Sequence, residues 1–189
     1  MLMEKVTVPE GKSGEWEVSK FIISEKELGF AMFRYGSRSP RPGEYTKLTH
    51  CNAVIMSDTD AEMRDHYVAV INAQGHVLIN GLGLGMVLQA CMEKEEVTKA
   101  TVVEKAQDVI NLVEPHYKKM YGDNIEIIHA DALIWNPPKK QRYGMVWHDI
   151  WENICGDNYE EMKTLHRRFG RRADWQGSWC KYETIRANQ

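Results

Sequence analysis

The sequence is poor in paired cysteines and histidines. Its four cysteines, Cys51, Cys91, Cys155 and Cys180, lie far apart, and none forms a C-x-x-C pair. This spacing argues against a disulfide framework, a zinc ribbon and a redox dithiol, and it predicts free thiols that are mostly buried. The seven histidines are likewise scattered, without an H-x-x-x-H pair that would place two imidazoles on one helical face. We therefore expect no metal site.

Long apolar runs and an excess of positive charge are also absent. No apolar run approaches the roughly 20 residues that a membrane-spanning helix requires, so we expect no membrane segment. The N-terminal Met-Leu-Met-Glu-Lys-Val places charges where a signal peptide has its apolar region, which predicts a cytoplasmic protein. With 24 Lys and Arg against 27 Asp and Glu, the formal net charge is −3, unlike that of a generally basic nucleic-acid binder.

What is present is enough apolar content for one globular domain with a small appendage. We expect residues 1–56 to form a β-rich N-terminal appendage. Within it, Trp16–Ile23 and Glu44–Met56 carry β-branched and aromatic residues with partial alternation, which predicts short strands or a hairpin. The intervening residues 34–43 are rich in Arg, Ser, Pro and Gly and predict a connecting loop.

Residues 57–189 are expected to form the main domain, in which short buried strands alternate with helical stretches. That alternation is typical of a parallel sheet with helices on both faces. We expect strands at His76–Asn80, Ala100–Glu104, Asn124–His129 and Met145–Asp149, and helices at Ala61–Asn72, Met86–Lys94, Ala106–Tyr117 and Asn158–Arg168. The fold class predicted is therefore α/β, with a Rossmann-like, mostly parallel sheet.

Three alternating glycines stand between the first of these strands and the helix that follows it. Gly81, Gly83 and Gly85 would let a ligand approach the backbone at the helix N-terminus without obstruction by a Cβ atom. A glycine turn of this kind also serves tight packing of a strand against its helix, and this alternative stays open.

Polar residues end the next two strands at the same sheet edge. Glu104 follows the glycines by about 20 residues, where an acid in a nucleotide-binding α/β unit accepts hydrogen bonds from both ribose hydroxyls. Asp131 and Ala132 follow the third strand, where a carboxylate and the adjacent backbone can contact an adenine. An Asp after a strand is also a common cap or turn residue. Together the three strand ends predict a nucleotide-like ligand.

The fourth strand ends with His148 and Asp149, either of which could take a proton from a substrate as a general base. Because successive side chains of a strand point to opposite faces, only one of the two is expected to face the reacting centre, and we favour Asp149. The alternative is that both are structural.

The C-terminal tail Leu165–Cys180 concentrates arginine and tryptophan. Arginine beside tryptophan suits contact with phosphates and stacking on bases, so a nucleic-acid arm is one interpretation. We favour a structural one, in which Trp175 and Trp179 pack on the sheet edge in place of missing strands.

In their order, these motifs resemble those of the class I S-adenosylmethionine-dependent methyltransferase superfamily, and within it the branch that includes spermidine synthase. The resemblance is carried by Val77–Gly83, Val102–Ile110, Ile127–Ala132 and Tyr143–Asp149, and it covers roughly residues 45–155. It implies S-adenosylmethionine as cofactor, with Asp149 and His148 at the catalytic end. The cofactor-binding residues implied are Gly81, Gly83, Gly85, Glu104, Lys105, Asp131 and Ala132.

The sequence departs from the aminopropyltransferase pattern at two places. Leu84 replaces an acid inside the glycine turn, and Ile150–Asn153 replace the second acid and the proline that follow the fourth strand in that branch. The resemblance therefore implies a methyltransferase whose acceptor, a small molecule or a macromolecule, is unknown. Aminopropyl transfer is one alternative, and a non-catalytic cofactor-binding or interaction module is another.

The expected sheet is truncated at its C-terminal side. A full methyltransferase sheet has seven strands, but only about 40 residues follow Asp149, too few for three more strands with their helices. The residues that close over an acceptor would then come from the N-terminal segment, the tail or another subunit, so a homo-oligomer is among the expectations.

Overall fold

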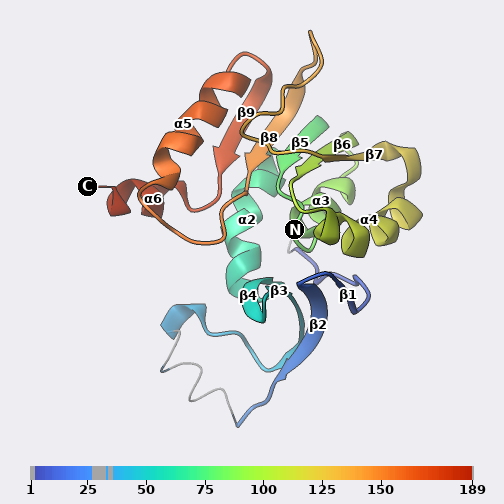
Figure 1. Cartoon of the computed structure of the whole chain (residues 1–189), viewed down its shortest axis with the longest axis vertical. Coiled ribbons are helices and arrows are strands. Elements are labelled where there is room, and N and C mark those ends of the chain that lie inside the picture. The colour runs from blue at the N-terminus through green and yellow to red at the C-terminus, as the bar shows by residue number, and fades with distance from the viewer. Residues whose placement is uncertain (1–2, 27–32, 34–35, 189) are drawn as a thin grey trace.

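The N-terminal part of the chain forms a four-stranded antiparallel sheet (Figure 1). The computed structural model describes residues 3–26, 33 and 36–188. The sheet runs in the order β1 (Gly11–Ser13), β2 (Trp16–Ile23), β3 (Gly43–His50) and β4 (Ala53–Ser57). The expected strands are confirmed. The predicted loop 34–43 holds a short 3-10 helix, η1 (Gly36–Arg38), and its first two residues lie outside the described part.

A second sheet of five parallel strands forms the centre of the molecule. Its order is β7-β6-β5-β8-β9, with β5 in the middle. The bounds are β5 (Gly75–Asn80), β6 (Val97–Glu104), β7 (Ile125–His129), β8 (Tyr143–His148) and β9 (Ala173–Ser178). The α/β, Rossmann-like fold predicted from the sequence is confirmed, and in the described residues the sheet ends at β9.

Helices cover both faces of this sheet. They are α2 (Asp60–Asn72), α3 (Met86–Met92), α4 (Gln107–Tyr121), α5 (Asn158–Phe169) and α6 (Lys181–Ala187), and the short η2 (Gly122–Asn124) precedes β7. Successive side chains of β5 are buried on opposite faces of the sheet. Val77 and Ile79 pack in one cluster with residues of α2, α3 and α4. Leu78 packs in a second cluster with Leu165 and Phe169 of α5. This is the two-sided burial that a continuous apolar strand predicts.

The N-terminal sheet shares the larger of these two cores. Val18 of β2 and Leu48 of β3 belong to the same buried cluster as Val77 and Ile79. Within the N-terminal part, Asp58 ties the segment before β1 to β3, because its two carboxylate oxygens accept the backbone N–H of Val6 at 3.2 Å and of Thr46 at 2.7 Å. The appendage therefore packs onto the central sheet, although the domain boundary at residue 56 stays a prediction.

Two expectations need correction. The tail does not replace missing strands with packed tryptophans alone: residues 173–178 form a fifth parallel strand, and Trp175 stacks on Trp147 of β8 at 6.3 Å between ring centroids. The prediction that most thiols are buried is also wrong. Cys51 is exposed, Cys155 and Cys180 are partly exposed, and Cys91 is buried. All four are free, as expected.

No helix in the described part of the chain combines the length and the apolar character that crossing a membrane demands.

Candidate functional site

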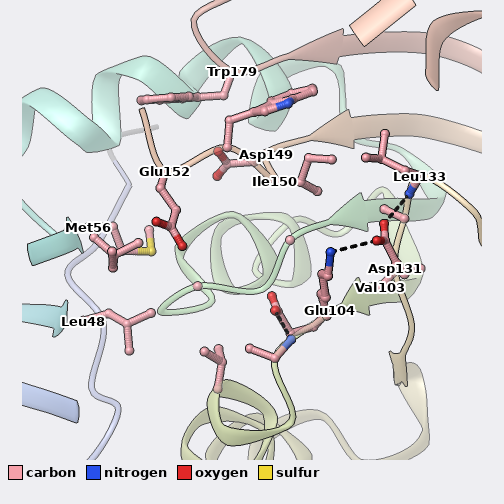
Figure 2. Close-up of a pocket in the computed structure, with 18 of the residues that line it drawn as sticks. Leu48, Met56, Val103, Glu104, Asp131, Leu133, Asp149, Ile150, Glu152 and Trp179 are labelled. Atoms are coloured by element: carbon pink, nitrogen blue, oxygen red, sulfur yellow. Dashed lines mark hydrogen bonds and ion pairs between the residues drawn. The ribbon is translucent and has the colours of Figure 1, made fainter. Parts of the chain in front are cut away.

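A cavity of about 380 Å³ opens at the carboxyl edge of the parallel sheet (Figure 2). Residues that follow all five strands contribute to its wall, and the N-terminal sheet and α2 close its other side. Parallel α/β sheets bind ligands at this edge, beside the central strand from which the connections run in opposite directions. The lining residues predicted from the sequence are Gly81, Gly83, Glu104, Lys105, Asp131, Ala132 and Asp149.

The three glycines of the turn differ in their surroundings. Gly81 has φ 98°, and a Cβ atom there would lie 1.9 Å from the carbonyl oxygen of Asp149, so only glycine lets the ends of β5 and β8 approach. Gly83 lines the cavity beside Met56. Gly85 does not line it: this residue precedes α3, and a Cβ atom would lie 2.1 Å from the ring of Tyr117. Its role is packing.

Glu104 lies at the end of β6, and its carboxylate is held in place by the backbone on both sides. One oxygen accepts the N–H of Leu82 in the glycine turn at 2.7 Å, and the other accepts the N–H of Ala106 at 2.8 Å. A carboxylate offers about four acceptor positions, so each oxygen keeps one for a ligand. The side chain is therefore fixed in direction and still able to accept two further hydrogen bonds.

Asp131 follows β7 and forms a second carboxylate at the same edge. It accepts the N–H of Leu133 at 2.8 Å and pairs with Lys105, whose Nζ lies 2.9 Å away. The hydrogen bond from Lys105 holds the pKa of Asp131 below its usual range, so the carboxylate is charged at neutral pH. Ala132 lies beside it in the wall of the cavity.

The loop that carries Asp131 and Ala132 is clamped by an arginine of the tail. The guanidinium of Arg168 donates to the carbonyl oxygens of Ala132 at 2.6 Å and of Trp135 at 2.9 Å, and also to that of Leu133. This places one of the tail arginines in a structural role. It also links α5 to the cavity wall.

Asp149 and His148 occupy different environments, as strand alternation predicts. Asp149 lines the cavity, with a side chain that is 19% exposed, and burial raises its pKa. His148 is fully buried and does not line the cavity. The amide nitrogen of Asn80 lies 2.7 Å from its Nδ1, and burial lowers its pKa to about 3, so the ring is neutral. His148 is therefore placed to pack within the sheet and to contact Asn80, and it does not face the cavity.

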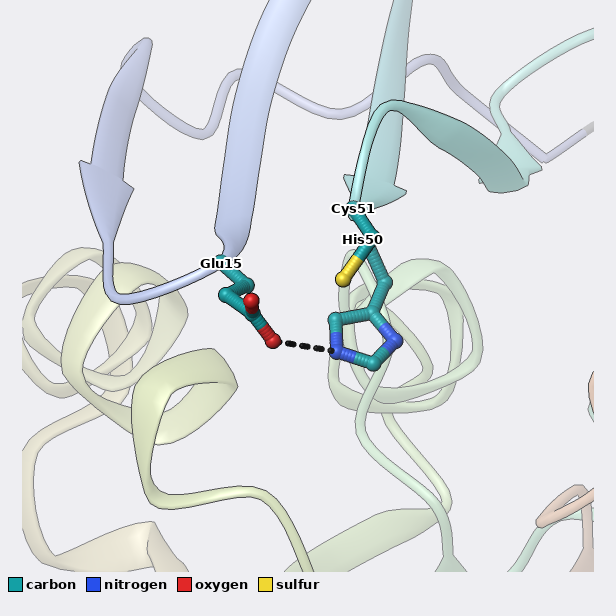
Figure 3. Close-up of side chains that lie close together, drawn as sticks. All are labelled: Glu15, His50 and Cys51. Atoms are coloured by element: carbon teal, nitrogen blue, oxygen red, sulfur yellow. Dashed lines mark ion pairs between the residues drawn. The ribbon is translucent and has the colours of Figure 1, made fainter.

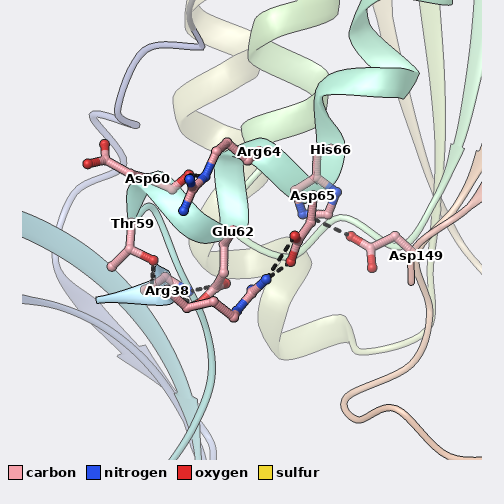
Figure 4. A network of polar contacts seen from close by, with 9 residues as sticks. Arg38, Thr59, Asp60, Glu62, Arg64, Asp65, His66 and Asp149 are labelled. Atoms are coloured by element: carbon pink, nitrogen blue, oxygen red, sulfur yellow. Dashed lines mark hydrogen bonds and ion pairs between the residues drawn. The ribbon is translucent and has the colours of Figure 1, made fainter. Parts of the chain in front are cut away.

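Two residues of α2 that belong to none of the sequence motifs also face the cavity. His66 is buried, its Nε2 lies 3.7 Å from Oδ2 of Asp149, and its Nδ1 has no hydrogen-bond partner (Figure 4). Glu62 lies one helical turn earlier and accepts both the N–H and the hydroxyl of Ser57. Arg38 holds the same helix through a two-pronged pair with Asp65, at 3.0 and 2.7 Å.

The cavity is strongly acidic and partly aromatic. Six carboxylates line it: Glu62, Glu104, Asp131, Asp149, Glu152 and Glu161. Among the described residues of its wall, Lys105 is the one Lys or Arg, and it is already paired with Asp131. Three tryptophans, Trp16, Trp151 and Trp179, add apolar surface. Trp151 is fixed by a hydrogen bond of 2.7 Å from its Nε1 to Glu161.

The chain resembles known proteins in its fold and not in its sequence. No protein-family model matches the chain, and no curated protein matches its sequence. Spermidine synthase from Thermotoga maritima superposes with a TM-score of 0.51 at 15% identity, over 86% of this chain and 52% of that one. The protein PH1948 from Pyrococcus horikoshii, described as a "putative RNA methyltransferase", gives a TM-score of 0.49 at 13% identity, over 64% of this chain and 58% of that one. The CcbJ methyltransferase from Streptomyces caelestis gives 0.45 at 17%, over 59% and 43%.

The chain thus spans about half the length of these proteins, and at such identities the likeness concerns the fold alone. The order of the five parallel strands, the glycine turn after the central one and the superposition on spermidine synthase agree with one another. The chain has the fold of the class I S-adenosylmethionine-dependent methyltransferases, in a form that it shares with spermidine synthase.

Proposed function

We propose that the protein is an S-adenosylmethionine-dependent methyltransferase. The observation that carries this proposal is the arrangement of Glu104 and Asp131, which end adjacent strands, face one cavity and keep their carboxylates oriented by backbone N–H groups. That is the arrangement that a ribose and an adenine require at the edge of a parallel sheet. The cavity also falls within the usual size of small-molecule sites, roughly 300–1,000 Å³.

The residues present fit the cofactor. Glu104 would accept hydrogen bonds from both ribose hydroxyls with the acceptor positions that its backbone partners leave open. Asp131 and the backbone of Ala132 would hold the adenine, and Gly81 and Gly83 would admit the chain between ribose and sulfur. When bound, S-adenosylmethionine supplies a methyl group that is already activated for transfer.

The acceptor would bind at the other end of the cavity, beside Asp149 and His66. An activated methyl group needs an aligned acceptor more than it needs acid–base catalysis. Asp149 would orient the acceptor and take its proton, and the raised pKa suits this carboxyl to that role. His66 would hold Asp149 in position, since its Nε2 faces Oδ2 of that residue.

Aminopropyl transfer is the second candidate, and the charge of the cavity favours it. S-adenosylmethionine carries a carboxylate, whereas its decarboxylated form carries only positive charge. The wall offers six carboxylates, and its one Lys or Arg among the described residues is paired. A ligand without a carboxylate therefore meets less repulsion. The replacement of the family's second acid by Ile150–Asn153 counts against this candidate.

Calorimetric titration with S-adenosylmethionine, S-adenosylhomocysteine and the decarboxylated cofactor tests both proposals. Tight binding of the first two supports methyl transfer, and a preference of tenfold or more for the decarboxylated form supports aminopropyl transfer. Binding without turnover across amine, nucleic-acid and small-molecule acceptors would indicate a non-catalytic module. If none of the three ligands binds, the proposed function is wrong.

A further inference from the structure

Two β-turns of the N-terminal sheet lie side by side and bring together three side chains that are not paired by their spacing in the sequence (Figure 3). Glu15 belongs to the turn between β1 and β2, and Cys51 to the turn between β3 and β4, directly after His50. Because β2 pairs with β3, the two turns meet at the same end of the sheet. One carboxylate oxygen, one imidazole nitrogen and one sulfur lie within 4.8 Å of one another.

The backbone holds these side chains in register. The N–H of Cys51 donates to the carbonyl oxygen of Glu15 at 3.0 Å, which ties one turn to the other. The ring of His50 stacks on Trp16, its partner across the strand pair, at 4.4 Å between centroids and 13° between planes. In this orientation, Nε2 of His50 lies 3.8 Å from Oε2 of Glu15. The stacked ring of His50 is therefore oriented before a ligand binds, whereas the exposed side chains of Glu15 and Cys51 can rotate toward it.

The position of Cys51 is unusual for a cysteine. It has φ 49° and its neighbour Asn52 has φ 66°, so both central residues of this two-residue hairpin turn are left-handed. Asn and Gly are the residues that such turns favour, and a side chain such as that of cysteine is strained there. The thiol is exposed, so apolar packing does not explain it.

We propose that Glu15, His50 and Cys51 form a zinc site, with water as the fourth ligand. Carboxylate, imidazole and thiolate are the ligands that Zn²⁺ accepts, and three of them with an open position suit its tetrahedral preference. On binding, the thiol of Cys51 releases its proton to solvent and the sulfur ligates as a thiolate, with no change of oxidation state. Ligands of a tetrahedral zinc lie roughly 3.3 to 3.8 Å apart, a contraction that side-chain rotation supplies.

The site would act on the cavity through Trp16. This tryptophan stacks on His50 with one face and also lines the cavity. A bound ion would fix the imidazole and with it the tryptophan that lies against it. The proposal does not depend on the proposed function, because it concerns different residues and a different ligand.

Titration of the full chain with Co²⁺, followed by competition with Zn²⁺, tests the site. A cobalt thiolate absorbs in the near ultraviolet, so the wild type should develop a charge-transfer band that Zn²⁺ abolishes. The variants Cys51→Ser and His50→Ala should lose the band or weaken the affinity at least about tenfold. Cys155→Ser, which removes a thiol distant in sequence from these turns, should behave as the wild type does.

Three results would overturn the proposal. These are the absence of a band in the wild type, an unchanged band in Cys51→Ser, and the loss of the band in Cys155→Ser. Circular dichroism of each variant shows that the comparison is between folded proteins. Glu15→Gln keeps size and polarity at an exposed position, and weaker binding in this variant supports the third ligand, whereas unchanged affinity removes Glu15 from the site.

Discussion

Replacing Glu104 with alanine removes the group on which the cofactor assignment depends most. Without this carboxylate, the ribose hydroxyls would lose two charge-assisted hydrogen bonds. Hydrogen bonds to charged groups contribute about 1.5–3 kcal/mol each. Because water replaces part of this loss at a partly buried site, we expect a net cost of about 3 kcal/mol. That corresponds to a dissociation constant raised roughly a hundredfold.

The same substitution frees two backbone donors. The N–H groups of Leu82 and Ala106 lose their partner. Ala106 lines the cavity, where water can replace the carboxylate, whereas Leu82 is buried in the glycine turn. We therefore expect the variant to fold, with a free energy of unfolding lower by about 1–3 kcal/mol. Glu104→Gln keeps one acceptor oxygen and should fall between the wild type and the alanine variant.

Calorimetric titration with S-adenosylhomocysteine measures the effect, and a neighbouring acid supplies the control. Glu126 of β7 is exposed, pairs with Lys99 at 3.1 Å and does not line the cavity. Glu126→Ala should bind as the wild type does. If folded Glu104→Ala keeps an affinity within twofold of the wild type, Glu104 does not hold the ribose and the assignment is wrong.

Three further predictions concern the glycine turn, a buried histidine and the tail. Gly83→Val introduces a side chain at φ 51° against Met56. It should weaken cofactor binding at least tenfold while the circular dichroism spectrum stays native. Unchanged binding would mean that the glycine turn serves packing alone. His148 has a pKa of about 3 in the folded protein against about 6.5 when unfolded, so the unfolded chain binds the proton more readily and stability falls as pH drops below about 7. Urea unfolding should show a loss of about 2 kcal/mol from this residue between pH 7 and 5, and a His148→Gln variant with the same pH dependence would contradict it. Arg168→Ala leaves three carbonyl oxygens without their donor and should lower both the melting temperature and the cofactor affinity, whereas the exposed Arg167→Ala should change neither.

The central strands could be predicted because their signals are local. The apolar run ending at Asn80 and the glycines after it specify a buried strand and a sharp turn without reference to the rest of the chain. β9 escaped prediction because Ala173–Ser178 contains Asp, Gln and Gly and has little strand character of its own. It becomes a strand through its pairing with β8, which is a tertiary effect.

The residues that line the cavity fall into the same two groups: some are predictable from local sequence signals, and others are brought there only by tertiary packing. Glu104 and Asp131 were predicted because the ends of parallel strands must meet at one edge. Glu62 and His66 have no such signal, because only the docking of α2 against β8 brings them to the cavity and places His66 beside Asp149. One signal was available: these two polar residues lie four positions apart, and so share one face of a helix whose buried side they occupy.

The wall of the cavity is assembled from separate stretches of the chain. Residues 81–132 supply the carboxylates and glycines assigned to the cofactor, whereas the opposite wall comes from residues 16–66 and 149–179. Substitutions in the outer stretches that preserve the contacts of Arg168 with the Asp131 loop and of Asp149 with Gly81 can therefore accumulate without displacing the inner one. Under the proposed function, an enzyme with this layout would exchange its acceptor while keeping its cofactor, and chimeras that swap the outer stretches between relatives would inherit the acceptor preference of the donor.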